Sequence, residues 1–71
     1  MTKPTKLTNN VRQSRLLAEL TQEQLASQLG VNRQTILAIE NGKYSPNLEL
    51  AFQMARILDV ALEELFSLPE N

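Results

Sequence analysis

Hydrophobic positions recur at helical spacing along most of the chain. Apolar side chains three and four residues apart mark one face of a helix, and this pattern predicts helices over about 8–19, 21–29, 33–41, 48–58 and 62–66. No segment shows the alternation of hydrophobic and polar residues that is typical of a strand. The sequence therefore predicts an all-α fold, a compact bundle of five helices.

The ends of these segments carry residues that begin or end helices. Four segments begin at a good N-cap residue: Thr8, Thr21, Asn32 and Asn47. Thr21 and Gln24 also have the spacing of a capping box, and Gly30 and Gly42 can adopt the left-handed conformation that ends a helix. Two short helices joined by the tight turn at 30–32 have the helix-turn-helix arrangement.

The same spacing assigns the buried face of each helix. The expected inner residues are Leu7, Val11 and Ala18; Leu25, Ala26 and Leu29; Ile36 and Ile39; Leu48, Ala51, Met54, Ala55 and Leu58; and Leu62, Leu65 and Phe66. Ser14 lies between the residues of the first of these faces, and Leu16 and Leu17 fall to its sides.

The C-terminal part of the chain has more apolar residues than so small a core can hide. They are Leu50, Phe52, Ile57, Leu62, Phe66 and Leu68. Because exposed apolar patches mark interaction sites, we predict that these residues form a homodimer interface. The alternative is that Phe52 and Phe66 complete the core.

The segment 33–41 has an outward face that its own packing does not need. Gln34, Leu37, Ala38 and Asn41 face outward, and Asn32, Arg33, Gln34 and Thr35 place four hydrogen-bonding side chains at the N-terminal end. In the major groove of DNA, Arg pairs with guanine, Gln with adenine, and an apolar side chain contacts the thymine methyl group. Acidic side chains are favoured at helix N-termini, so Arg33 there points to a role outside helix stability. We therefore predict that 33–41 is a recognition helix in the major groove.

Neighbouring polar residues are placed to contact the DNA backbone. The expected contacts are Thr21, Gln22, Asn32, Asn41, Lys43 and Tyr44. Gln22 lies in the first turn of its helix, where side chains and free amides bind phosphate oxygens. Thr21 and Asn32 cap their helices whatever the function.

Glu40 belongs to the predicted recognition helix but lies on the flank of its inner face. A carboxylate in that position needs a partner, and Arg15 occupies the border of the inner face of the first helix. An Arg–carboxylate pair would fix the geometry of the two helices. We predict a structural ion pair between Arg15 and Glu40.

Charge is distributed unevenly, although the net charge is only −1. Residues 1–44 contain six Lys or Arg against three Glu, whereas residues 45–71 contain one Arg against five Asp or Glu. The basic part includes the predicted recognition helix. This asymmetry favours a nucleic-acid partner over an ordinary solvated surface.

The composition excludes several classes of protein. The chain has no Cys and no His, so we expect no disulfide, no metal site, no cofactor and no enzymatic activity. No apolar run is long enough to cross a membrane, and the N-terminus lacks the pattern of a signal peptide; we expect a cytoplasmic, nucleoid-associated protein. The expected organisation is a flexible arm at 1–7, a DNA-binding domain at 8–67 and a tail at 68–71.

Four short segments, in this order and spacing, carry a resemblance: LTQEQLA, GVNRQTI, IENGKYSP and LEELF. Together they resemble the small helix-turn-helix regulators of the Cro and phage-repressor (XRE) family, over about residues 11–66. The resemblance implies five helices, DNA binding as a dimer, and repression or activation of transcription. It also implies Gln22 at a phosphate; Arg33, Gln34 and Ala38 at bases; Asn32, Thr35, Asn41, Lys43 and Tyr44 at the backbone or base edges; and pairing of Arg15 with Glu40.

Four positions depart from the family pattern. Glu19 and Asp59 stand where Gly is usual, Ser14 where a large apolar residue is usual, and Ala61 where a Ser or Thr cap is usual. None of them belongs to the predicted recognition helix. The departures therefore bear on packing and local stability, and Leu16 or Leu17 is expected to compensate for Ser14.

The predicted function is sequence-specific binding of double-stranded DNA by a sensor-less transcriptional regulator, a repressor acting as a homodimer on a palindromic operator. An antitoxin or a restriction–modification controller protein would have the same sequence pattern, with a toxin or regulator as a possible protein partner. A protein-interaction module that does not bind DNA is a further alternative, favoured by the acidic C-terminal part.

Overall fold

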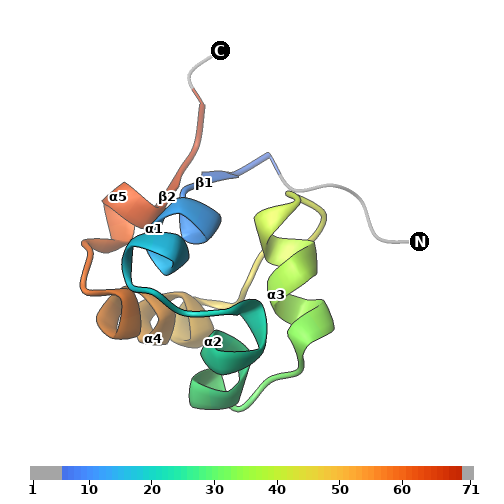
Figure 1. Cartoon of the computed structure of the whole chain (residues 1–71). Coiled ribbons are helices and arrows are strands. Elements are labelled where there is room, and N and C mark those ends of the chain that lie inside the picture. The colour runs from blue at the N-terminus through green and yellow to red at the C-terminus, as the bar shows by residue number, and fades with distance from the viewer. Residues whose placement is uncertain (1–5, 70–71) are drawn as a thin grey trace.

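Five helices form where the apolar spacing predicts them, in a computed structural model that describes residues 6–69 (Figure 1). The elements in chain order are β1 (Thr8–Asn9), α1 (Val11–Leu17), α2 (Gln22–Leu29), α3 (Arg33–Glu40), α4 (Leu48–Leu58), α5 (Leu62–Leu65) and β2 (Phe66–Ser67). The predicted all-α class is confirmed. Residues 1–5 of the predicted arm and 70–71 of the predicted tail lie outside the described residues, and the domain boundaries stay a prediction.

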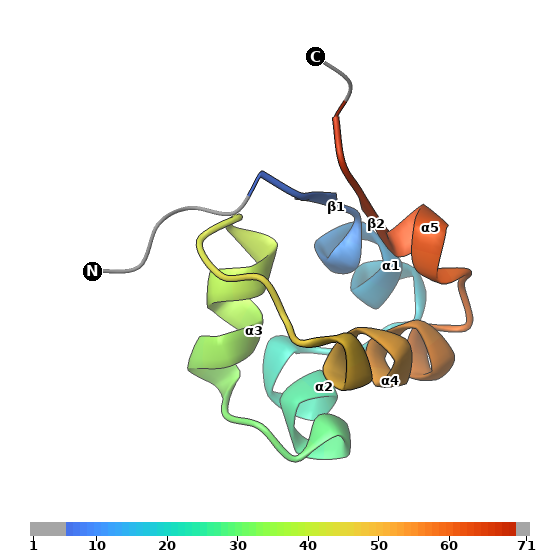
Figure 2. The ribbon, with the colours of Figure 1, turned by 180° about the vertical axis from the view of Figure 1, so that it is seen from behind.

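The helices are arranged so that α3 lies at one side of the molecule and α5 at the opposite side, with α2 next to α3 and with α4 below α1 and α5 (Figures 1 and 2). All five helices contribute to the interior. The largest fully buried side chains are Val11, Leu25, Ile36, Ile39, Met54 and Leu65. Because α3 is anchored by Ile36 and Ile39, its opposite face is directed away from the core. Among residues 6–69, no helix combines the length and hydropathy needed to cross a bilayer.

The predicted start of the first helix at Thr8 is wrong, as is the expectation that the chain contains no strand. Thr8 and Asn9 pair in antiparallel register with Ser67 and Phe66. The Thr8 hydroxyl lies 2.7 Å from the Ser67 hydroxyl. Helix α1 begins only at Val11, whose amide donates to Asn9 Oδ1. Two-residue strands are too short to show an alternating pattern, and Ser67 is remote in sequence.

The first four helices end with the same backbone closure. After each helix, one residue adopts a left-handed conformation: Glu19 (φ 60°), Gly30 (φ 73°), Gly42 (φ 72°) and Asp59 (φ 58°). The amide of the following residue then donates to the carbonyl five residues before it, as Leu20 does to Arg15 and Lys43 to Ala38. This hydrogen bond is that of the Schellman motif. It explains why the family pattern has Gly where this chain has Glu19 and Asp59.

Two expectations about α4 are wrong. Leu48, predicted to be buried, is 68% exposed, and Leu50, predicted at the dimer interface, is buried in the core. At about 100° per residue, Leu50 lies one turn before Met54 and two turns before Leu58 on the same stripe. Leu48 lies about 160° around the helix from Leu50, one turn before Phe52, which is 54% exposed.

The expected packing of the first helix is also wrong in part. Ala18 is exposed, and neither Leu16 nor Leu17 compensates for Ser14, since both are exposed. Instead, the side of α1 that faces α3 buries Arg15. The first helix is therefore anchored through Val11 and an ion pair rather than through a continuous apolar stripe.

Candidate nucleic-acid interface

Local hydrogen bonds fix the α2–turn–α3 unit. The Thr21 hydroxyl accepts from the Gln24 amide at 3.0 Å, and Gln24 Oε1 accepts from the Thr21 amide at 2.8 Å, which is the predicted capping box. Gly30 ends α2 in the left-handed conformation. Asn32 Oδ1 then accepts from the Thr35 amide at 2.9 Å and caps α3. The turn is therefore set by capping residues at both sides.

We define the outward face of α3 as Arg33, Gln34, Leu37, Ala38 and Asn41. Arg33, Gln34 and Asn41 are exposed, and Leu37 and Ala38 are half-buried. The polar side chains of this face make no hydrogen bond or ion pair with any residue from 6 to 69. Their donors and acceptors remain available to a partner. The sequence-based placement of these five residues on one face agrees with the structure.

Four other predicted contact residues already have partners within the chain. Thr21 and Asn32 are caps, as described above, and the Thr35 hydroxyl donates to Asn32 Oδ1 at 3.1 Å. Gln22 Nε2 donates to Glu40 Oε1 at 3.1 Å. The bond from Gln22 to Glu40 was not predicted, because residues 18 positions apart give no local signal.

The predicted contact between Arg15 and Glu40 is present. Arg15 Nε donates to Glu40 Oε2 at 2.7 Å and Nη2 to Oε1 at 3.3 Å, which makes the pair bidentate. Arg15 Nη1 also donates to the carbonyl of Leu20 at 2.9 Å. The side chains of Arg15 and Glu40 are only 8% and 3% exposed. Arg15 thus connects α1, the α1–α2 turn and the last residue of α3.

A residue that was not predicted holds the C-terminal end of α3. Asn9 Nδ2 donates to the carbonyl of Ile39 at 3.0 Å, while Asn9 Oδ1 accepts from Val11. Asn10 similarly donates through Nδ2 to the carbonyl of Glu64. The β1 segment therefore bridges α3 and α5. Two adjacent Asn residues before a helix suggest only a cap, so sequence offered no sign of these distant partners.

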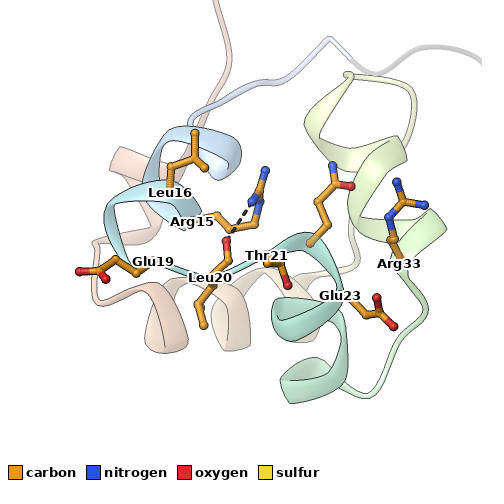
Figure 3. Close-up of a pocket in the computed structure, with 8 residues that line it drawn as sticks. Arg15, Leu16, Glu19, Leu20, Thr21, Glu23 and Arg33 are labelled. Atoms are coloured by element: carbon orange, nitrogen blue, oxygen red, sulfur yellow. Dashed lines mark hydrogen bonds between the residues drawn. The ribbon is translucent and has the colours of Figure 1, made fainter.

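An open hollow of about 470 Å³ lies where α1, α2 and α3 meet (Figure 3). Its lining includes Arg15 from α1, Thr21 and Gln22 at the start of α2, and Arg33 from the start of α3. The dashed line in Figure 3 marks the bond from Arg15 to Leu20. The N-terminal end of α2 and the guanidinium group of Arg33 border the same space, together with the carboxylates of Glu19 and Glu23. The helix amides and the guanidinium group are donors of the kind that bind a phosphate oxygen.

Lys43 and Tyr44 follow α3 and are both exposed. The Lys43 amide donates to the carbonyl of Ala38, which fixes the backbone beyond Gly42. The side chains of Lys43 and Tyr44 therefore extend from a defined turn beside the outward face of α3.

Comparison with known proteins gives a consistent assignment. A helix-turn-helix family model matches residues 11–65. An uncharacterised HTH-type transcriptional regulator of Methanocaldococcus jannaschii is 53% identical over 58 residues, which cover 82% of this chain and 88% of that protein. The cryptic phage CTXphi transcriptional repressor RstR of Vibrio cholerae is 37% identical over 59 residues, covering 83% of this chain and 53% of RstR.

A solved structure gives the same result in three dimensions. The restriction–modification controller protein C.AhdI from Aeromonas hydrophila matches with a TM-score of 0.73 and 32% identity, over 80% of this chain and 83% of that chain. The family match begins at the first residue of α1 and ends at the last residue of α5, so it includes the whole α2–turn–α3 unit. The chain belongs to the helix-turn-helix family of DNA-binding transcriptional regulators, of the Cro and phage-repressor (XRE) type.

Proposed function

We propose that the protein recognises a specific operator sequence by placing the outward face of α3 in the major groove. One observation carries this proposal: Arg33 and Gln34 are exposed and have no partner among residues 6–69, while the opposite face of α3 is buried. Arg33 and Gln34 have the bidentate donor and acceptor groups that distinguish guanine and adenine. Leu37 and Ala38 offer an apolar surface to a thymine methyl group.

The residues around this face are proposed to contact the sugar–phosphate backbone. They are Thr21, Gln22, Asn32, Thr35, Asn41, Lys43 and Tyr44. Contacts of this kind set orientation and register without distinguishing sequence. Lys43 contributes a charge, whereas Thr21 and Gln22 lie at the N-terminus of α2, where backbone amides favour an anion. Backbone contacts at the starts of α2 and α3 and after α3 would hold the recognition helix on both sides.

The protein is proposed to act as a homodimer through the α4–α5 apolar face, which we define as Leu48, Phe52, Leu62 and Phe66. A hollow of about 290 Å³ lies along this face, lined by Leu48, Leu62 and Phe66 among others. Leu62 and Phe66 are partly covered by the protein's own core, as Ile57 is, while Leu48 and Phe52 are exposed. Leu68, also part of the predicted interface, is 70% exposed beyond this hollow. Leu50 is excluded from the interface because it is buried.

A second copy of the chain suits this face because its apolar residues are exposed and a basic residue lies beside acidic ones at its edge. Arg56 and the acidic residues Asp59, Glu63 and Glu64 line a second hollow beside Phe52. In a two-fold interface the same patch meets itself, so Arg56 of one copy can face an acidic residue of the other. A two-fold dimer then places two recognition helices about one helical turn apart on a palindromic site.

The experiment that tests sequence recognition is selection of bound sites from a random duplex pool, followed by a variant. The pool is expected to yield a palindromic site, whose half-site spacing gives the dimer geometry. Gln34→Ala should then lower affinity for the selected site about 5- to 150-fold, since a good bidentate pair discriminates by about 1–3 kcal/mol, with a much smaller loss on random DNA. Gln53→Ala, an exposed Gln on α4, is the matched control and should change neither. An equal loss on both DNAs for Gln34→Ala would contradict base recognition.

Repression is the proposed direction of regulation, supported by the 37% identity to the repressor RstR. A second role within the same activity is that of a restriction–modification controller protein, favoured by the similarity to C.AhdI. A reporter gene placed behind the selected operator distinguishes repression from activation. Repression predicts that expression falls as the protein is supplied, and a rise would contradict it.

A further inference from the structure

We infer that Glu40 is a positioning residue for DNA binding, because its carboxylate orients the side chain of Gln22 toward the backbone of the bound duplex. The inference rests on the proposed function, in which Gln22 contacts a phosphate. It assigns to Glu40 a role beyond the ion pair with Arg15. Glu40 itself has no access to DNA, since its side chain is only 3% exposed.

The carboxylate of Glu40 connects three helices. Oε2 accepts from Arg15 Nε at 2.7 Å, and Oε1 accepts from both Arg15 Nη2 at 3.3 Å and Gln22 Nε2 at 3.1 Å. Arg15 belongs to α1, Gln22 to α2, and Glu40 is the last residue of α3. One oxygen therefore serves the ion pair and Gln22 together, and the orientation of the Gln22 amide depends on where Arg15 holds that oxygen.

This arrangement leaves part of the Gln22 amide free. A Gln side chain has two N–H donors and one carbonyl acceptor, and only one donor bond, to Glu40, is made within residues 6–69. Gln22 is half-buried and lines the open hollow that Arg33 also borders. The second N–H is consequently available at the start of α2, where the helix amides also favour an anion.

A fixed amide binds better than a mobile one. Immobilising a flexible side chain on binding costs conformational entropy, and a side chain that is already ordered loses less of it when the ligand binds. The charge on Glu40 does not repel the approaching phosphate strongly, because Arg15 neutralises it at hydrogen-bonding distance. Glu40 thus orders Gln22 without adding an unpaired negative charge to the interface.

The first test uses the wild-type protein without DNA. Side-chain amide signals of Gln22 in ¹⁵N relaxation experiments are expected to be as ordered as the backbone, with one proton protected from exchange. Gln28 and Gln53 are exposed Gln residues on helices with no side-chain partner among residues 6–69, and they serve as controls. Equal mobility of Gln22 and these controls would overturn the inference, whatever the DNA affinity.

The second test is a double-mutant cycle on DNA affinity. Glu40→Asp keeps the charge but withdraws the carboxylate, and Gln22→Ala removes the amide; each is expected to weaken operator binding about two- to tenfold, the value of one hydrogen bond. The double variant should bind no more weakly than Gln22→Ala alone, because both changes remove the same contact. Glu23 is an exposed carboxylate that lines the same hollow, and Glu23→Asp is the matched control, which should leave operator affinity unchanged.

The outcomes separate the inference from the proposed function. If Glu40→Asp lowers operator affinity equally in the wild-type protein and in the Gln22→Ala variant, Glu40 acts on α3 alone. If Glu40→Asp does not lower operator affinity, Gln22 does not need Glu40 in order to bind. Either result overturns the inference while DNA recognition stands. If the wild-type protein binds all duplexes equally, the proposed sequence specificity is overturned. The inference about Glu40 is then tested by the ¹⁵N relaxation of the Gln22 side chain, which does not depend on DNA.

Discussion

Replacing Glu19 with Gly is expected to stabilise the protein. Glu19 has a φ of 60° in the closure that follows α1, where the Leu20 amide donates to the carbonyl of Arg15 at 3.0 Å. Its side chain is exposed and has no hydrogen bond or ion pair with another residue from 6 to 69. The substitution therefore removes strain without removing a contact.

The size of the gain follows from three terms, of which one opposes it. The left-handed conformation raises the free energy of a residue with a side chain by about 1–2 kcal/mol, and Gly does not carry this strain. Gly in turn loses more conformational freedom on folding, at a cost of about 0.5–1 kcal/mol relative to Ala. A carboxylate beside the negative end of α1 adds a small unfavourable term that is also removed. The net gain is about 0.5–1 kcal/mol, which corresponds to a rise in Tm of roughly 2–8 °C for a domain of this size.

Thermal unfolding followed by circular dichroism measures the effect, with two control variants. Glu19→Ala removes the same charge but keeps the strain, so its Tm should stay within about 2 °C of the wild type. Glu23→Gly makes the same substitution in the first turn of α2, where it removes a favourable acidic side chain and lowers helix propensity, so its Tm should fall. A Tm for Glu19→Gly at or below that of the wild type would refute the account of this closure.

The remaining predictions concern the ion pair and the dimer. Glu40→Ala should lower the free energy of unfolding by about 3–5 kcal/mol, because it leaves the Arg15 charge buried without its partner; exposed Glu49→Ala should change it by less than about 0.5 kcal/mol. Denaturant titration gives both values, and an unchanged midpoint for Glu40→Ala would contradict the structural role of the pair. Phe52→Glu should convert the dimer to a monomer in sedimentation equilibrium and weaken operator binding, whereas Leu17→Glu, at a 79% exposed site on α1, should do neither. A Phe52→Glu protein that remains dimeric would exclude the α4–α5 apolar face.

Local signals in the sequence predicted much of the fold. The bounds of α4 follow from Asn47, which caps its first turn through a 2.8 Å bond to the Leu50 amide, and from the run of apolar residues that ends at Leu58. The capping box at Thr21 and Gln24 likewise depends on residues three apart. The contact between Arg15 and Glu40 could be predicted because each residue lies on the flank of a buried face, where a charge needs a partner.

Contacts between distant segments could not be predicted from the same signals. Thr8 is a reasonable helix cap by itself, and only its pairing with Ser67, 59 residues away, turns it into a strand residue. The exposure of Leu48 and the burial of Leu50 depend on how α4 is rotated against the other helices. The bond from Gln22 to Glu40 requires knowledge of how α2 and α3 cross, which no helical pattern contains.

Titration of DNA binding across a salt series tests the central claim most directly. Wild-type protein and Arg33→Ala would be titrated into the selected operator and into random duplex DNA at salt concentrations from about 50 to 200 mM. For the wild type, log affinity should fall linearly with log salt, by about 0.9 for each phosphate neutralised, and the operator should bind at least about 10³-fold more tightly than random DNA. Arg33→Ala should lower that preference about 5- to 150-fold, the value of one bidentate base contact. Absence of wild-type binding to either duplex at the lowest salt would contradict DNA recognition by α3.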